Sequence, residues 1–310
     1  MGQDMIKYTR EAICELFAKG EPLAGLDLTG IDLSSLDLAQ ADFSDAILNR
    51  VNFSNSDLST AVFIAANLAE CDFSNANLVK TNFSKADLNK VNAKSANLSY
   101  ADLSEADLSY ADFSEAKFES AYGEYANFTG SNLSRANFTN AQLPSADFSD
   151  CIMDHADFQY SNIAKSSLGA CSGKDINMSY ADITGLRAGD GCALLRGKFL
   201  QAKADGSIWE GADLRESDFS YAELAKANFV GADLSKATMY AVDAKNSLFS
   251  QAKLVSANLT MANYFRSSFE QAKLVAADLS GSNCYEVEFL EAELTGVILK
   301  KTILDQTKLA

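Results

Sequence analysis

The sequence has little proline: Pro22 and Pro144 are the only two in 310 residues, and no stretch is rich in proline, glycine and serine together. Linkers usually have that composition, so its scarcity predicts one continuous domain without a hinge. The sequence also lacks an apolar run near the roughly 18 residues that cross a membrane. Residues 1–20 carry charges throughout and lack the apolar core of a secretory signal. We therefore expect a cytoplasmic protein that does not enter a membrane.

Residues with catalytic or metal-binding chemistry are also scarce. His155 is the single histidine, and it lies at an outward position of a five-residue repeat. A general base instead has to lie in a cleft that holds the substrate. The glycine-rich GGxGxD loops of calcium-binding β-helices are absent. Gly189-Asp190-Gly191 is too short for a phosphate-binding loop. The sequence therefore predicts no enzyme activity, no catalytic residue, no metal site and no cofactor.

What the sequence does have is a five-residue repeat from Asp27 nearly to the C-terminus, of the form Ala-(Asp/Asn)-(Leu/Phe)-Ser-X. A period of five fits neither an α-helix nor a flat strand. In most units a small residue lies two positions before an apolar central residue, as Ala41 precedes Phe43. If these two side chains point inward, the chain turns a corner every five residues. The first central residues are Leu28, Leu33, Leu38, Phe43, Leu48, Phe53, Leu58, Phe63, Leu68, Phe73, Leu78, Phe83 and Leu88.

Four corners close a coil of twenty residues, and two further patterns have this period. Stacked aromatic side chains fill a narrow axis without voids. In the last third of the chain they recur at Trp209, Phe229, Phe249, Phe269 and Phe289. An asparagine between two carboxylates reduces their repulsion and can form hydrogen bonds along the column. The outward position alternates in this way through Asp32, Asn52, Asp72, Asn92, Asp112 and Asn132.

Units such as Ala41-Asp42-Phe43-Ser44, Ala101-Asp102-Leu103-Ser104 and Ala106-Asp107-Leu108-Ser109 resemble the pentapeptide-repeat family. The resemblance covers about nine-tenths of the chain. It implies an all-β fold, a right-handed quadrilateral β-helix solenoid. At twenty residues a coil the repeats make about 14 coils, and at roughly 4.8 Å per coil a rod on the order of 70 Å long. Such a fold does not fix an activity.

Residues 1–22 precede the repeats and contain a helix signal. Thr9 can cap a helix, the ten residues that follow are compatible with one, and Gly20 can end it. An open coil exposes apolar core and unpaired backbone groups. We therefore expect a short N-terminal helix to cap the first coil.

The repeats occupy residues 23–310, and their register breaks once. Central positions run through Ala188 and resume at Leu194, so one extra residue lies near 189–191, between glycines that suit a bulge or corner loop. Central leucines then keep the spacing to the end of the sequence. A final coil without a cover favours a homodimer through the C-terminal coil.

Five of the six cysteines fall in the repeat at central or small inward positions. The favoured interpretation is that they are small buried side chains in place of alanine. Two of them are twenty residues apart, and a third continues their column if one residue has been inserted. Stacked coils bring Cα atoms within the disulfide range of about 4.4 to 6.8 Å, so oxidation of this column is compatible with the fold but not required. The five are Cys71, Cys151, Cys171, Cys192 and Cys284.

The net charge of −16 is unevenly distributed. Residues 1–155 hold 23 acidic and 10 basic residues, whereas residues 156–310 hold 19 and 16. An acidic surface repels nucleic acid and membrane headgroups and favours a basic protein partner. We therefore expect a protein partner with a basic surface and no direct nucleic-acid binding.

Residues 97–127 combine this charge with aromatic side chains. Seven acidic residues face a single base, Lys117, and four tyrosines are interleaved at outward or corner positions. Exposed tyrosines among carboxylates favour a protein interface over the alternative, an ordinary solvated face. The candidate interface consists of Tyr100, Asp102, Glu105, Asp107, Tyr110, Asp112, Glu115, Glu119, Tyr122, Glu124 and Tyr125.

Taken together, the sequence favours a non-enzymatic protein-binding scaffold with an acidic surface. The resemblance implies two more specific functions. Some pentapeptide-repeat proteins imitate duplex DNA at DNA gyrase, a type II topoisomerase, and an acidic rod that forms a homodimer fits this DNA mimic function. The segment from Thr9 to Gly30 is similar to pentapeptide proteins associated with type VI secretion. That similarity favours the alternative function, an accessory or adaptor protein for effector delivery.

Overall fold

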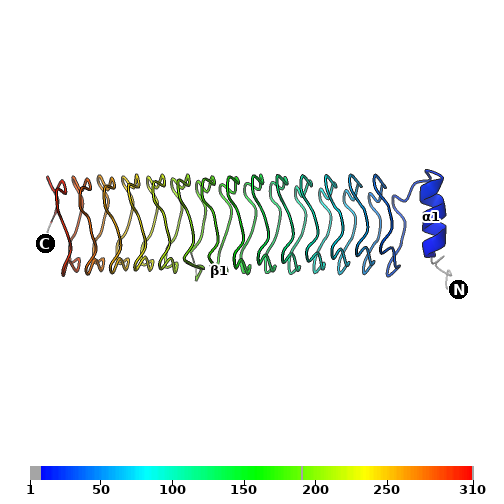
Figure 1. Ribbon diagram of the computed structural model, residues 1–310, viewed down its shortest axis with the longest axis horizontal. Coiled ribbons are helices and arrows are strands. Elements are labelled where there is room, and N and C mark those ends of the chain that lie inside the picture. The colour runs from blue at the N-terminus through cyan, green and yellow to red at the C-terminus, as the bar shows by residue number, and fades with distance from the viewer. Residues whose placement is uncertain (1–7, 190, 309–310) are drawn as a thin grey trace. The chain divides into compact units, whose positions relative to one another are not determined.

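The computed structural model describes residues 8–189 and 191–308. The chain forms two compact units, Met1–Ala146 and Asp147–Ala310. Within each unit the backbone winds in coils that lie side by side (Figure 1). Parallel bridges join residues twenty apart, for example Asp27 with Ile47 in the first unit. The twenty-residue coil is therefore confirmed.

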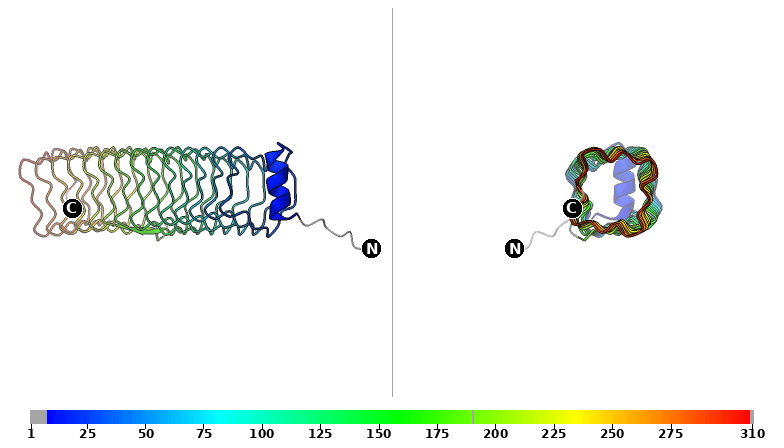
Figure 2. Two further views of the ribbon diagram at one scale, coloured as in Figure 1. Left: turned by 45° about the vertical axis from the view of Figure 1, so that its right-hand side comes forward. Right: turned by 90° about the vertical axis from the view of Figure 1, so that its left-hand side faces the viewer.

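A residue in the left-handed conformation closes each five-residue repeat. In the repeat centred on Leu38, the amide of Ala41 donates to the Leu38 carbonyl over 3.1 Å, and Gln40 between them has a φ of 68°. The same conformation recurs every five residues, with φ between 52° and 68° where the residue is not glycine. Four such turns give a coil four sides, and the right-hand view of Figure 2 looks along the coils.

Hydrogen bonds between successive coils hold the sides together. The amide of Leu33 donates to the Asn52 carbonyl over 2.8 Å, and the amide of Asn52 donates to the Ile31 carbonyl over 3.0 Å. A left-handed residue other than glycine costs about 1–2 kcal/mol. Each inter-coil hydrogen bond contributes about 1 kcal/mol, and a fully buried central side chain about 1.5–3 kcal/mol. The ladder and the core together therefore outweigh the cost of the turns.

Two short strands lie where the register changes. β1, Ser172–Lys174, and β2, Ala193–Leu195, pair in parallel with Ser172 opposite Ala193, a separation of 21 residues rather than twenty. The predicted extra residue is therefore confirmed. Gly191 has a φ of 88°, and a Cβ added to it would meet nothing within 4 Å, so the turn has room for the insertion. Asp190, which belongs to the predicted insertion, lies outside the described residues.

Aromatic rings fill the core in columns. The predicted column of the second unit is confirmed, with Phe229 stacked on Phe249 at 5.0 Å between ring centroids. In the first unit Phe43 stacks on Phe63 at 5.0 Å, and Phe53 meets Phe63 edge to face at 5.9 Å. Two columns from opposite sides of the coil therefore meet along the axis of the first unit, in the geometry that aromatic pairs prefer.

The predicted N-terminal helix is present as α1, Arg10–Ala18. The predicted cap, Thr9, accepts a hydrogen bond at its Oγ1 from the amide three residues on, at 3.2 Å. Arg10 reaches from the helix to an early coil, where its guanidinium donates to the carbonyls of Asp32 and Ser34 over 3.2 and 2.7 Å. These contacts attach α1 to the coils of its own unit.

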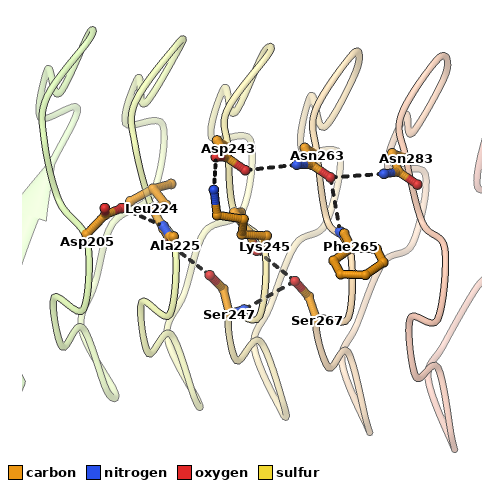
Figure 3. A network of polar contacts seen from close by, with 11 residues as sticks. Asp205, Leu224, Ala225, Asp243, Lys245, Ser247, Asn263, Phe265, Ser267 and Asn283 are labelled. Atoms are coloured by element: carbon orange, nitrogen blue, oxygen red, sulfur yellow. Dashed lines mark hydrogen bonds and ion pairs between the residues drawn. The ribbon is translucent and has the colours of Figure 1, made fainter.

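Outward Asp and Asn side chains satisfy the backbone and also link the coils. Asn263 Oδ1 accepts from the amide of Phe265 at 3.3 Å, and its Nδ2 donates to Asp243 at 2.9 Å (Figure 3). The first bond straddles the central residue and recurs through the repeat. In the alternating column Asn92 donates to Asp72 over 3.0 Å. The expected bonding along that column is therefore confirmed at this pair.

Tyr264 is a core residue with one unmatched polar atom, and its replacement gives a test of the core. The hydroxyl oxygen is buried and finds no hydrogen-bond partner among the described residues, while the ring meets Phe249 and Phe269 edge to face. Burial raises the pKa of this phenol. We expect Tyr264→Phe to raise the free energy of unfolding by about 1–3 kcal/mol, because it removes a buried hydroxyl that is not hydrogen-bonded. Urea unfolding measures the change.

The exposed Tyr122 provides the matched control, and Tyr122→Phe should leave the unfolding curve unchanged. A loss of stability in Tyr264→Phe would show that the hydroxyl is hydrogen-bonded after all.

Candidate protein interface

The left-handed turn position places several candidate residues in solvent. The backbone alone closes the turn, so the side chain at this position is not needed to form the turn and can be large or charged. Tyr110 and Tyr125 are each 62% exposed. The candidates at this position, with φ between 57° and 61°, are Tyr100, Glu105, Tyr110, Glu115 and Tyr125.

The structure brings seven candidates to one side of the first unit. Asp102 and Tyr122 are direct neighbours in a parallel bridge. At one edge of this side the amide of Tyr100 donates to the Glu119 carbonyl over 2.9 Å, and an equivalent bond joins the turns at the other edge. We call this surface the Tyr122 face. It consists of Tyr100, Asp102, Glu105, Glu119, Tyr122, Glu124 and Tyr125.

The other four candidates lie on the remaining sides of the coil. Residues 97–127 span more than one coil, so the stretch wraps around all four sides. Asp107 and Asp112 bridge with residues of the next coil on two later sides, and Tyr110 packs over the turn one coil on. Glu115 accepts a hydrogen bond from a serine one coil before, at 3.1 Å. The stretch is thus divided in space and does not form a single surface.

The Tyr122 face contains two carboxylates without a partner. Within the described part of the chain, the side chains of Glu119 and Glu124 make no hydrogen bond or ion pair, whereas Glu105 lies 3.9 Å from the ammonium group of Lys85. Partial burial favours the neutral form of Asp102, but hydrogen bonds from the serine two residues on outweigh it and lower the pKa of this carboxyl. The face is therefore negatively charged at neutral pH.

Three exposed tyrosine rings lie on the same face as these carboxylates. Tyr100, Tyr122 and Tyr125 are 49%, 54% and 62% exposed. An exposed phenol ring offers a flat apolar surface on which a guanidinium group can stack. A carboxylate close to it can pair with the same guanidinium through two hydrogen bonds. The arrangement can therefore bind arginine side chains.

Sequence reasoning missed an apolar extension of the Tyr122 face. Val62 occupies the same outward column as Asp102, two coils earlier, with Asn82 between them. Ile64, two residues beyond Val62, is 39% exposed. The signal was present in the sequence, because a β-branched apolar residue replaces Asp or Asn at an outward position.

His155 lies at one end of a ladder of acidic and basic side chains in the second unit. Its Nδ1 lies 3.9 Å from Asp175 Oδ2, and Asp175 accepts two hydrogen bonds from Arg196, at 2.8 and 2.7 Å. The Arg196 guanidinium holds the pKa of Asp175 below its usual range. A further pair, Lys236 and Glu216 at 3.8 Å, continues the ladder. The predicted outward position of His155 is confirmed, and Asp175 beside it is paired with Arg196.

Other parts of the described chain offer little further chemistry. Among these residues no three His, Cys, Asp or Glu side chains gather in a way that could hold a metal. None of their helices has the length and apolar character to cross a bilayer. A groove in the second unit is lined in part by Arg266, Glu286, Glu288 and Lys308, whose charges pair with one another.

Known family patterns match the repeat. The pattern described as a pentapeptide repeat region matches residues 26–103, 66–148 and 91–168, and the pattern described as pentapeptide repeats in eight copies matches residues 199–235 and 272–309. These segments together make up more than half of the chain. The chain belongs to the pentapeptide-repeat family. Members of this family are generally structural or binding proteins.

Solved structures of other pentapeptide-repeat proteins are similar at low identity. HetL, involved in heterocyst differentiation regulation in the cyanobacterium Nostoc sp. strain PCC 7120, is 22% identical over 97% of this chain and 96% of its own, with a TM-score of 0.41. Rfr23 from the cyanobacterium Cyanothece 51142 is 21% identical over 34% of this chain and 87% of its own, with a TM-score of 0.29. QnrB1, a plasmid-mediated fluoroquinolone resistance protein, is 17% identical over 57% of this chain and 88% of its own, with a TM-score of 0.31. A search of curated protein sequences found no match.

We expect the exposed rings of the Tyr122 face to contribute little to folding of this pentapeptide-repeat protein. Tyr122→Ala and Tyr125→Ala should each change the free energy of unfolding by less than about 0.5 kcal/mol, because neither ring packs in the core. Phe118→Ala should cost about 3–5 kcal/mol, because that ring is fully buried and stacks on Phe138. Urea unfolding of the three variants gives the comparison. If Tyr122→Ala were as damaging as Phe118→Ala, the ring would have a structural role.

Proposed function

We propose that this pentapeptide-repeat protein is a non-enzymatic scaffold whose Tyr122 face binds a protein with a basic surface. The observation that supports the proposal is that three exposed tyrosine rings share one face with two carboxylates that have no partner in the described chain. Aromatic residues are enriched in protein interfaces, where buried charges are paired. A partner that inserts arginines between the rings satisfies both conditions.

The chemistry of the face favours arginine over lysine in the partner. A planar guanidinium can stack on a tyrosine ring and pair through two hydrogen bonds with Glu119 or Glu124, whereas an ammonium group can do neither as well. The acidic excess of residues 1–155 attracts such a partner over a longer distance and accelerates association. Binding of this kind weakens with salt, because the Debye length falls from about 8 Å at 0.15 M to about 3 Å at 1 M.

Affinity capture from the native cell with the purified chain tests the scaffold function. We expect a basic protein to bind at about 0.15 M salt and to be released near 1 M. Glu124→Lys should weaken capture at least about tenfold, because it places a like charge against the partner. Glu115→Lys, an equal charge change on another side of the coil, is the matched control and should retain capture. Equal capture by both variants, or capture that ignores salt, would contradict the proposal.

A more specific form of the proposal is a DNA mimic that acts on DNA gyrase, a type II topoisomerase. The family resemblance suggests this target. It is supported by the regular carboxylates of the first unit, where Asp32, Asp72 and Asp112 alternate with asparagines in one column of bridges. Regularly spaced negative charge is what a DNA-binding surface of an enzyme recognises before it contacts bases.

Supercoiling assays with purified gyrase test the mimic directly. We expect the chain at micromolar concentration to inhibit supercoiling or to protect the enzyme from a quinolone, and the effect to fade as salt rises. No effect at micromolar protein would remove the DNA-mimic function. The scaffold proposal would then still stand or fall on the capture experiment.

An accessory or adaptor function in type VI secretion is the alternative. It rests on the similarity of the segment from Thr9 to Gly30. Within this segment Thr9 caps α1 and Arg10 binds the carbonyls of an early coil, so both residues also have structural roles. Recovery of a secretion component or an effector in the capture experiment, with no effect on gyrase, would favour this function.

Several finer expectations stay predictions. They are the right-handed sense of the winding, the number of about 14 coils, the division at residue 22, the capping role of α1 and the cytoplasmic location. The homodimer through the C-terminal coil is a prediction too. Leu299 and Ile303 there are 41% and 48% exposed, which is apolar surface that a second copy would cover.

A further inference from the structure

Two cysteine thiols meet across the register break in the second unit. Cys171 Sγ and Cys192 Sγ are 2.8 Å apart, and their side chains are 0% and 1% exposed. Both residues occupy the small inward position of their repeat. Because one residue is inserted before it, Cys192 takes the place beside Cys171 that Gly191 would occupy at a spacing of twenty.

The backbone fixes both cysteines in this arrangement. The amide of Ala193 donates to the Cys171 carbonyl over 2.9 Å, and the amide of Cys192 donates to the Gly189 carbonyl over 3.2 Å. The paired strands β1 and β2 begin at the next residue of each coil. Neighbouring strands lie about 4.8 Å apart, within the Cα spacing of about 4.4–6.8 Å that disulfides require. No coil has to move to bring the sulfurs together.

We propose that Cys171 and Cys192 form a disulfide bond that joins the two coils at the register break. The oxidant is a low-molecular-weight disulfide such as oxidised glutathione. The thiolate of one cysteine attacks the glutathione disulfide and releases one glutathione thiolate. The thiolate of the other cysteine then attacks the mixed disulfide and releases the second. Two electrons pass from the cysteine sulfurs to the glutathione disulfide, and the two cysteine protons end on the released thiolates.

Burial determines how readily this bond forms. The hydrogen bond between the thiols and the desolvation of the site raise the pKa of the Cys171 thiol, which lowers the thiolate fraction at neutral pH. Both thiols are buried, so exchange with glutathione requires local opening, which we place at the exposed turn at Gly191, where an added Cβ would meet nothing within 4 Å. We therefore expect slow oxidation near pH 7 that accelerates as pH rises. In a reducing compartment the pair stays as thiols.

Peptide mapping of the full chain tests the proposal. The chain is incubated with oxidised glutathione near pH 8 and digested with trypsin without reduction. Cys151, Cys171 and Cys192 fall in separate tryptic peptides, 136–165, 166–174 and 188–196. We expect a linked pair of the last two peptides, loss of two of the six free thiols, and a rise in Tm of about 5 °C that a reductant reverses.

Variants separate this bond from the other cysteines. Cys192→Ala should abolish both the linked peptide and the rise in Tm, and it should fold because alanine is the usual residue at this position. Cys151→Ala should retain both effects, and so should Cys71→Ala, a small inward cysteine in the first unit. Two results would overturn the proposal: all six thiols persisting after refolding in oxidised glutathione, or a linked peptide that joins Cys151 to Cys171.

Discussion

The left-handed residue at each turn is the constraint on which the rest of this structure depends. It lets the amide beyond the turn return to the central carbonyl, and it places the next side in register with the coil twenty residues away. This conformation costs about 1–2 kcal/mol at a residue other than glycine. Each five-residue repeat must therefore offset that free-energy cost with its inter-coil hydrogen bonds and its buried central side chain. Stability is therefore local, and each coil depends mainly on its neighbours.

Packing constrains the inward positions closely and leaves the outward ones free. At Gly123, a central position without a side chain, an added Cβ would lie 2.6 Å from Leu143, whose side chain fills the space. Elsewhere stacked rings about 5 Å apart fill the axis. Turn residues such as Tyr125 carry no such load, because the backbone closes the turn whatever the side chain. Binding residues can therefore accumulate at turns without a loss of stability.

The coil length, the register break, the aromatic column of the second unit and α1 could all be predicted from the sequence, since each is periodic or local. The two aromatic columns of the first unit were also within reach, because Phe alternates with Leu from Phe43 to Phe83 and so falls on opposite sides. The extent of the interface was not predicted correctly, because residues close in sequence lie on different sides of the coil. In a four-sided coil Tyr122 lies beside Asp102, whereas Glu115 lies on another side. The place of Cys192 beside Cys171 was also within reach, because one inserted residue continues the cysteine column.

The way the insertion is absorbed explains why one extra residue leaves the fold intact. An extra residue within a strand would turn every later side chain to the opposite face, including Leu194. Here the glycine turn takes it up, and the bridges return at once to a spacing of twenty, with Ala193 opposite Asp213. Central residues from Leu194 to Phe289 stay buried. On every side of the coil at the break the bridged residues are 21 apart, as with Arg187 and Ile208, and in this register Cys192 lies beside Cys171. An insertion at a turn is thus tolerated because every later side chain keeps its face of the coil.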